Sequence, residues 1–109
     1  TAYNPKLAEF AKGADVLVHE SLYVPAVDRL VIKTKNGATL KKHLLESHTT
    51  TEDVGRIAAA AGVKVLVLSH FVPGDDPLVT DDNWTEDVKK NFTGRIVVAK
   101  DLMQLALPV

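Results

Sequence analysis

Titratable residues follow two apolar stretches of this chain at the same relative place. Residues 14–18 lead directly into His19 and Glu20, and residues 63–68 lead into Ser69 and His70. An apolar run of this length, bounded by turn residues, is typical of a strand buried on both faces. Sites in open α/β sheets form at the carboxyl ends of parallel strands. Glu20 and His70 are therefore candidates for chemistry.

His48 is the third candidate, and it precedes a predicted helix start at Thr50 or Thr51. A helix N-terminus presents free N–H groups and the positive end of the helix dipole, which suit an anion such as phosphate. Glu20, His48 and His70 thus occupy loop or strand-end positions that are able to meet at one edge of a sheet.

Each candidate also has a plainer interpretation. A histidine at a strand end is more often a hydrogen-bonded structural residue than a ligand. His48 would also fit a simple capping segment, because threonines are adequate caps without it. Glu20 would fit a surface carboxylate, and His43, which lies in a lysine-rich helix, is expected to face solvent.

Two further groups favour structural roles. Four aspartates between residues 75 and 82 look like a carboxylate cluster that could bind a cation. Asp is also common in loops and at helix caps, so a solvated loop is the better interpretation. An aromatic and apolar set at helical spacing favours core packing over ligand stacking. The first group is Asp75, Asp76, Asp81 and Asp82, and the second is Trp84, Val88 and Phe92.

Apolar periodicity, caps and glycines predict alternating helices and strands. The alternation argues for an α/β fold with parallel pairing. A β-hairpin around Asn36-Gly37 is the alternative for the middle of the chain. We expect helices over 5–12, 25–33, 40–47 (capped by Thr39) and 51–61, and strands over 14–20, 63–70, 95–99 and 103–107. A loop from Phe71 to Asn83 leads into a further helix that contains Trp84, Val88 and Phe92, is capped by Asp81 or Asp82 and ends at Gly94.

Composition limits the possible functions. The 109 residues suffice for one domain, and 46% hydrophobic with 25% charged residues is an ordinary globular balance. A net charge of −1 gives no overall footprint for nucleic acid or membrane, although it does not exclude a local basic patch. Without cysteine, any metal must be held by His, Asp or Glu. No apolar run approaches a membrane span, and no signal peptide is visible.

Three segments together resemble the C-terminal half of a metallo-β-lactamase-fold hydrolase, in the ribonuclease Z-like and arylsulfatase-like branch. They are residues 13–20, 47–50 and 61–71. That branch carries a His-Glu-Ala-Thr segment after a strand, a His-Ser-Thr segment before a helix, and a strand ending in a metal-binding histidine. This chain departs from it with Ser21-Leu22 and with Thr49.

The resemblance implies a fold and a set of roles. The fold would be the C-terminal half of an αβ/βα sandwich, spanning residues 1–109. His70 would be a metal ligand, His48 the proton donor to the leaving oxygen, and Glu20 the carboxylate that orients His48. The complete enzyme would hold two zinc ions, with manganese or iron as alternatives, and would hydrolyse phosphodiesters or related esters. A lactonase, sulfatase or thioester hydrolase, and a non-enzymatic α/β module with structural histidines, are the alternatives.

The HxHxDH motif that supplies most metal ligands in that family is absent from this sequence, and residues 1–5 resemble those that follow the family's bridging aspartate. We therefore expect an upstream N-terminal half as a partner, and an inactive chain without it. The substrate would be a small ester or a nucleic acid. Half a sandwich leaves an apolar face uncovered, so we expect homo-oligomers. No membrane association is expected, and the location would be cytoplasmic, with the periplasm as the alternative.

Overall fold

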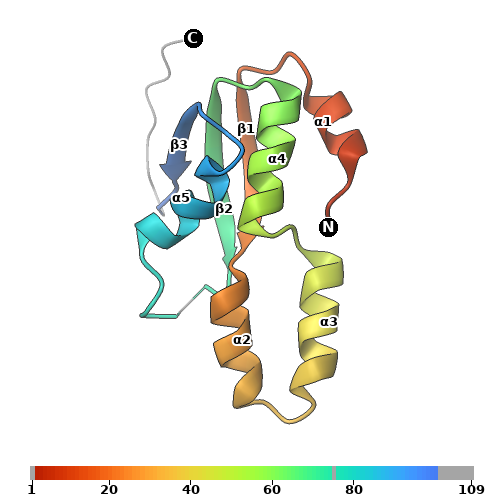
Figure 1. Ribbon diagram of the computed structural model, residues 1–109, viewed down its shortest axis with the longest axis vertical. Coiled ribbons are helices and arrows are strands. Elements are labelled where there is room, and N and C mark those ends of the chain that lie inside the picture. The colour runs from red at the N-terminus through yellow and green to blue at the C-terminus, as the bar shows by residue number, and fades with distance from the viewer. Residues whose placement is uncertain (1, 75, 101–109) are drawn as a thin grey trace.

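The computed structural model describes residues 2–74 and 76–100 (Figure 1). This part of the chain is a mixed α/β structure, as predicted. Its elements in chain order are α1 (Pro5–Ala11), β1 (Val16–Leu22), α2 (Val24–Ile32), α3 (Gly37–Ser47), α4 (Thr51–Ala61), β2 (Val65–Val72), α5 (Asp81–Lys89) and β3 (Arg95–Val98).

The three strands of the described residues form one parallel sheet in the order β1-β2-β3. Val16 pairs with Val65, and Val65 pairs with Arg95, so all three strands begin at the same edge. Their carboxyl ends consequently meet at the opposite edge, as the site prediction requires. The central strand is the most buried, since Val65–Leu68 are all at most 6% exposed.

Helices α1, α4 and α5 cover one face of the sheet. Leu66 and Leu68 of β2 project into a cluster formed with these helices, which Leu17 and Val98 of the outer strands border. The helix residues of the cluster are Ala8 from α1, Val54, Ile57, Ala58 and Ala61 from α4, and Trp84 and Val88 from α5. The prediction that Trp84, Val88 and Phe92 belong to the core is confirmed.

The other face of the sheet is apolar and partly open. Successive side chains of a strand point to opposite faces, so Val16 and Val18 of β1 lie opposite Leu17. Val18 is 62% exposed, which is unusual for a valine in a parallel sheet. This face therefore presents apolar surface to whatever lies beside it.

Helix ends follow the predicted signals at several places. The Asn4 side chain caps α1, Thr50 caps α4 by accepting from the Asp53 N–H, and Gly62 ends α4 at φ 72°. Glycine adopts this left-handed conformation without the cost that a Cβ imposes.

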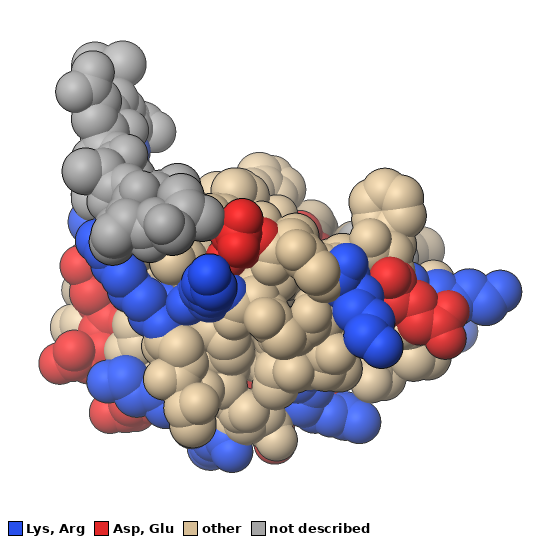
Figure 2. Space-filling model, turned by 90° about the horizontal axis from the view of Figure 1, so that it is seen from above, with Lys and Arg blue, Asp and Glu red and all other residues tan. Residues whose placement is uncertain are grey.

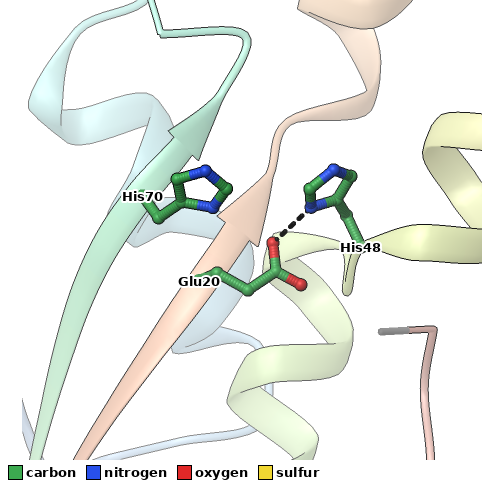
Figure 3. A group of neighbouring side chains, drawn as sticks. All are labelled: Glu20, His48 and His70. Atoms are coloured by element: carbon green, nitrogen blue, oxygen red, sulfur yellow. Dashed lines mark hydrogen bonds and ion pairs between the residues drawn. The ribbon is translucent and has the colours of Figure 1, made fainter.

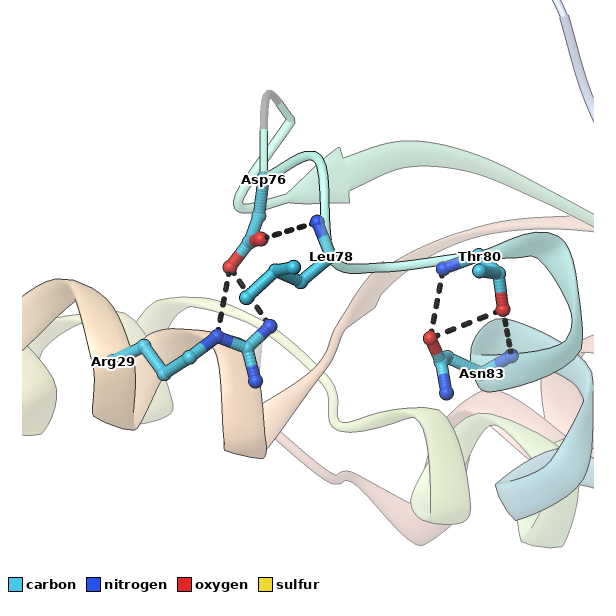
Figure 4. A network of polar contacts seen from close by, with 5 residues as sticks. All are labelled: Arg29, Asp76, Leu78, Thr80 and Asn83. Atoms are coloured by element: carbon cyan, nitrogen blue, oxygen red, sulfur yellow. Dashed lines mark hydrogen bonds and ion pairs between the residues drawn. The ribbon is translucent and has the colours of Figure 1, made fainter.

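Two predicted helix starts are wrong. Helix α3 begins at Gly37 after Asn36 in the left-handed conformation, so Thr39 is inside the helix and does not cap it. Thr80 caps α5 in place of Asp81 or Asp82, because its hydroxyl accepts from the Asn83 N–H while the Asn83 side chain accepts from the Thr80 N–H (Figure 4). This reciprocal capping box satisfies two backbone donors at once.

Two further boundaries need correction. Strand β2 continues past His70 through Phe71 and Val72, because both residues pair with the end of β1. Helix α5 ends at Lys89, so Phe92 lies beyond it, although Phe92 is still buried in the core cluster at 4% exposure.

Helices α2 and α3 form an antiparallel pair, here called the arm (residues 24–47), which projects from the sheet (Figure 1). The alternative β-hairpin around Asn36-Gly37 is therefore wrong. Only Ala26 and Val27 of α2 are buried in the arm, and α3 has no buried residue. The predicted strand over 103–107 lies outside the described residues. None of the helices described is both long enough and apolar enough to span a membrane.

Close contact between α4 and α5 generates a first prediction. Alanine is favoured over glycine inside an isolated helix by about 1 kcal/mol. A Cβ on Gly55, however, would lie only 2.6 Å from the carbonyl oxygen of Val88. We expect Gly55→Ala to lower the free energy of unfolding by about 1–3 kcal/mol in urea titrations, as overpacking does.

The control is Ala59→Gly on the exposed side of the same helix, which tests propensity without a packing conflict. It should cost about 1 kcal/mol. A higher urea midpoint for Gly55→Ala would contradict the close approach of the two helices.

Candidate active site

The three predicted site residues lie together at the carboxyl edge of the sheet (Figure 3). Glu20 is on β1, His70 is on β2, and His48 directly follows α3. One ligand atom from each lies within 4.8 Å of the other two. Residues separated by up to 50 positions in the sequence thus converge because β1 and β2 pair in parallel.

Glu20 is held through both carboxylate oxygens. Oε2 lies 2.9 Å from His48 Nδ1, and Oε1 accepts a 2.8 Å hydrogen bond from the Thr49 N–H. A backbone hydrogen bond supports these two contacts, because the Leu22 N–H donates to the Thr49 carbonyl at 2.9 Å. The segment before α4 is thereby fastened alongside the end of β1.

The contact between Glu20 and His48 is partly shielded from water, because the two side chains are 19% and 21% exposed. The hydrogen bond that one ring nitrogen of a histidine makes determines the role left to the other nitrogen. Nε2 of His48 is consequently the nitrogen left for other partners. The arrangement suits a histidine that holds or transfers a proton.

His70 reaches the site because of an irregularity in β2. Glu20 pairs with Ser69, and Ser21 pairs with Phe71, so His70 is the extra residue of a β-bulge. Its φ is 48°, in the left-handed region that side chains rarely adopt. Such a conformation costs about 1–3 kcal/mol and is concentrated at functional sites, where bulges re-aim side chains.

The donor set fits a borderline metal ion such as zinc. Two imidazoles and one carboxylate are ordinary zinc donors. The centroids of the His48 and His70 rings lie 5.8 Å apart, and His70 is exposed. Both carboxylate oxygens of Glu20 are already engaged, one with His48 and the other with Thr49. Of the three, His70 is therefore the residue best placed to bind an ion.

An open cleft of about 720 Å³ adjoins His70. Its walls include Phe71, whose ring packs on Trp84 at 4.7 Å, and Lys100, which pairs with Asp81 at 2.6 Å. The cleft combines aromatic, apolar and charged groups beside the candidate metal ligand.

An ion pair anchors the loop that follows β2 to the arm (Figure 4). Asp76 Oδ2 accepts from Arg29 on α2 at 2.9 Å, and Oδ1 accepts from the Leu78 N–H at 2.9 Å. The Leu78 hydrogen bond, together with the Arg29 guanidinium, holds the pKa of the Asp76 carboxyl below its ordinary value of 3.8. The loop carrying one wall of the cleft is thus attached to α2.

Among the described residues, the other polar candidates do not join the grouping of Glu20, His48 and His70. His43 is exposed on α3. Asp76 and Asp81 form ion pairs with basic residues, and in the described ranges 2–74 and 76–100 the grouping that could hold a metal is Glu20, His48 and His70. Asp75 lies outside the described residues.

Sequence patterns missed three features of the site and its surroundings. The Thr49 N–H that holds Glu20 is a backbone group, so residue type carries no signal for it. The bulge at His70 depends on the register with β1. The Arg29–Asp76 pair joins residues 47 positions apart, and neither residue belongs to a recognisable motif.

Comparison with known proteins yields relatives in sequence and in fold. No family model matches the chain. The crystal structure of the metallo-β-lactamase fold protein YhfI from Bacillus subtilis superposes on 92% of this chain and 34% of its own, with a TM-score of 0.62 and 23% identity. The α/β fold described above is therefore that of part of a metallo-β-lactamase fold protein.

Curated relatives in sequence carry the name ribonuclease Z. The Pseudomonas putida (strain GB-1) protein is 36% identical over 111 residues, covering 95% of this chain and 31% of that protein. The Nocardia farcinica protein is 35% identical over 106 residues, covering 95% and 29%, respectively. A putative ribonuclease Z of Mycobacterium tuberculosis (strain CDC 1551) is 33% identical over 96 residues, covering 88% and 40%. The chain spans about a third of the length of these relatives.

Over most of its length the chain is ribonuclease Z-like in sequence, and it has a metallo-β-lactamase type of fold. The resemblance predicted from residues 13–20, 47–50 and 61–71 is confirmed at this level. The roles of individual residues and the extent of the whole domain stay predictions.

The lowered pKa of Asp76 predicts a pH dependence of stability. A carboxyl whose pKa is lower in the folded than in the unfolded chain stabilises the fold above the unfolded pKa and loses this effect as the pH falls through the folded pKa. The difference in unfolding free energy between the native chain and Asp76→Asn should be constant near neutral pH and should shrink below pH 3.8. Urea titrations at stepped pH measure it.

Arg29→Gln should retain part of this pH dependence, because the Leu78 N–H still donates to Asp76. A difference that grows on acidification would contradict the assigned contacts.

Ser21 generates a third stability prediction. Its side chain is fully buried beside the site, and its hydroxyl has no hydrogen-bond partner among the described residues. A buried polar group without a partner costs about 1–3 kcal/mol. We therefore expect Ser21→Ala to raise the urea midpoint, whereas Ser69→Ala, at a half-buried serine of β2, should change stability by less than about 0.5 kcal/mol. A lower midpoint for Ser21→Ala would show that the hydroxyl is satisfied.

Proposed function

We propose that this chain is part of a metal-dependent hydrolase that cleaves phosphodiester bonds, as its ribonuclease Z-like sequence suggests. The observation that carries the proposal is the convergence of Glu20, His48 and His70 at the carboxyl edge of the sheet. The relatives named ribonuclease Z favour a phosphodiester over a lactone, sulfate ester or thioester.

His48 acts as the general acid in this proposal. The Glu20 carboxylate at Nδ1 orients the ring so that Nε2–H points at a substrate. As the bond to the leaving oxygen breaks, the Nε2 proton moves to that oxygen, and the neutral ring keeps its hydrogen bond to Glu20. Such proton transfer contributes about 10²–10⁴-fold to the rate.

Glu20 is a positioning residue. The Thr49 N–H fixes one carboxylate oxygen, so the other is held towards the His48 ring. The pair keeps His48 oriented without a direct contact between Glu20 and the substrate.

His70 would bind a metal ion, for which zinc is the first choice and manganese or iron are alternatives. When bound, the metal supplies Lewis-acid activation of a water and of the phosphoryl oxygens. A catalytic zinc needs about three protein ligands, so further ligands must come from outside the described residues. Two metals in the complete site follow from the family resemblance.

The partner that supplies these ligands is proposed to be the other half of the domain. This other half would cover the apolar sheet face that carries Val18, which is 62% exposed. The 109-residue chain without this partner would be inactive and would self-associate through the same face. The reaction itself would take place in the cytoplasm.

The proposal is tested by a chimera in which this chain replaces the matched third of the Pseudomonas putida ribonuclease Z. Two substrates separate the roles. Bis(p-nitrophenyl) phosphate has a good leaving group that needs little protonation, whereas a dinucleoside monophosphate has a poor one. His48→Ala should reduce kcat by about 10²–10⁴-fold on the dinucleotide and by much less on the nitrophenyl ester.

Other variants complete the experiment. Glu20→Gln should follow the same pattern with a smaller loss, and His70→Ala should remove activity on both substrates together with bound zinc measured by elemental analysis. His43→Ala, an exposed histidine of α3, is the matched control and should change nothing. Equal losses for His43 and His48, or full zinc content in His70→Ala, would favour a non-enzymatic module with structural histidines.

A further inference from the structure

The loop after β2 separates two clefts, and its described residues 73–74 and 76–79 are here called the wall. On one side of the wall is the cleft of about 720 Å³ that adjoins His70. On the other side is an apolar cleft of about 280 Å³, which the wall forms together with α2. Pro73 and Asp76 line both clefts, so a single segment of chain lies between α2 and the space beside His70.

Asp76 is the residue around which the wall is folded (Figure 4). Its Oδ1 accepts from the Leu78 N–H at 2.9 Å, and its carbonyl accepts from the Val79 N–H at 3.2 Å. Its Oδ2 accepts twice from Arg29, from Nη2 at 2.9 Å and from Nε at 3.2 Å. The charge of Lys33, at the end of α2, also favours the ionised Asp76 carboxyl. Helix α2 therefore holds the residue that organises the wall.

The ion pair between Arg29 and Asp76 differs from the exposed pairs elsewhere on the molecule. At the end opposite the arm, acidic and basic side chains are interspersed over the surface (Figure 2). Lys64 and Asp15, which precede β2 and β1 at that end, lie 3.7 Å apart with exposures of 68% and 53%. Asp76 is 15% exposed, the lowest value for a carboxylate in an ion pair of the described residues. Because partly buried pairs are screened less than exposed ones, this pair is suited to fix geometry.

The wall and the three converging residues are held by different contacts. Glu20 and His48 contact each other, and the Thr49 N–H fixes Glu20 at the junction of β1 with the segment before α4. His70 precedes the wall, but its strand continues for two further residues, and both pair with β1. Release of the wall from α2 should therefore change the shape of the cleft and leave the three residues in place.

We propose that Arg29 is a positioning residue of the candidate active site: it holds the wall through Asp76 and thereby sets the shape of the cleft beside His70. Binding of a substrate in that cleft rests on the proposed function, whereas the attachment of the wall to α2 rests on the contacts alone. Arg29 acts through Asp76 and not on the reacting atoms. Its loss should therefore weaken substrate binding more than it slows the chemical step.

The test in the chimera is the separation of KM from kcat. Arg29→Gln should raise KM for bis(p-nitrophenyl) phosphate and for the dinucleoside monophosphate by about 3–10-fold and leave kcat and bound zinc nearly unchanged. Arg29→Lys keeps the charge but loses the two-donor geometry of the guanidinium, so it should restore part of the lost binding. Lys41→Gln is the matched control, because it breaks an ion pair with Asp28 within the arm and leaves the wall attached. Its KM should equal that of the native sequence.

Hydrogen exchange of the 109-residue chain tests the attachment of the wall without any measurement of activity. Arg29→Gln should speed the exchange of the Leu78 and Val79 amides several-fold, because both N–H groups donate to Asp76 and local opening becomes easier. The exchange rates of Arg29→Lys should lie between those of Arg29→Gln and the native chain. Lys41→Gln should exchange at the native rate in the wall.

Two results would overturn the proposal: unchanged exchange of the two amides in Arg29→Gln, or a fall in kcat with KM unchanged. The second result would mean that α2 acts on the reacting groups and not on the cleft. If the chimera hydrolyses neither substrate while exchange in the wall still responds to Arg29, the proposed function fails and the attachment of the wall stands. If hydrolysis is normal and KM is independent of Arg29, only the positioning role fails.

Discussion

The site depends on one carboxylate that is shared between two parts of the chain. Glu20 accepts from the Thr49 N–H at 2.8 Å and contacts His48 Nδ1 at 2.9 Å, and this joins the end of β1 to the segment before α4. The backbone bond from Leu22 to Thr49 supports the same junction. Because hydrogen bonds to a charged, partly buried group are stronger than neutral ones, this junction is well suited to hold the His48 ring in place.

The regularly paired part of the sheet is the rigid support of the site, and an irregularity in β2 places His70 within it. A buried central strand, Val65–Leu68, sets the register with β1 through regular pairing. The register then shifts at His70, which adopts a left-handed conformation that a regular strand would not require. The cost of this conformation is offset by the packed strand on one side and by the paired residues Phe71 and Val72 on the other.

The same connections tie the site to its surroundings. The arm begins and ends beside Glu20 and His48, and Arg29 joins it to the loop after β2 through Asp76. One ion pair and the chain connections therefore join the arm and the loop after β2 to the carboxyl edge of the sheet.

The sequence by itself determined the α/β class, the parallel sheet and the three residues that converge at its carboxyl edge, because these depend on local signals: apolar runs, caps, and titratable residues where runs end. It also indicated that Trp84, Val88 and Phe92 are core. Tertiary structure decided what depends on pairing between distant segments. The extension of β2 through Val72 and the bulge at His70 follow from the register with β1. The projecting arm and the backbone donor to Glu20 have no local sequence signal, because both arise from where the folded chain places exposed surface and main-chain groups.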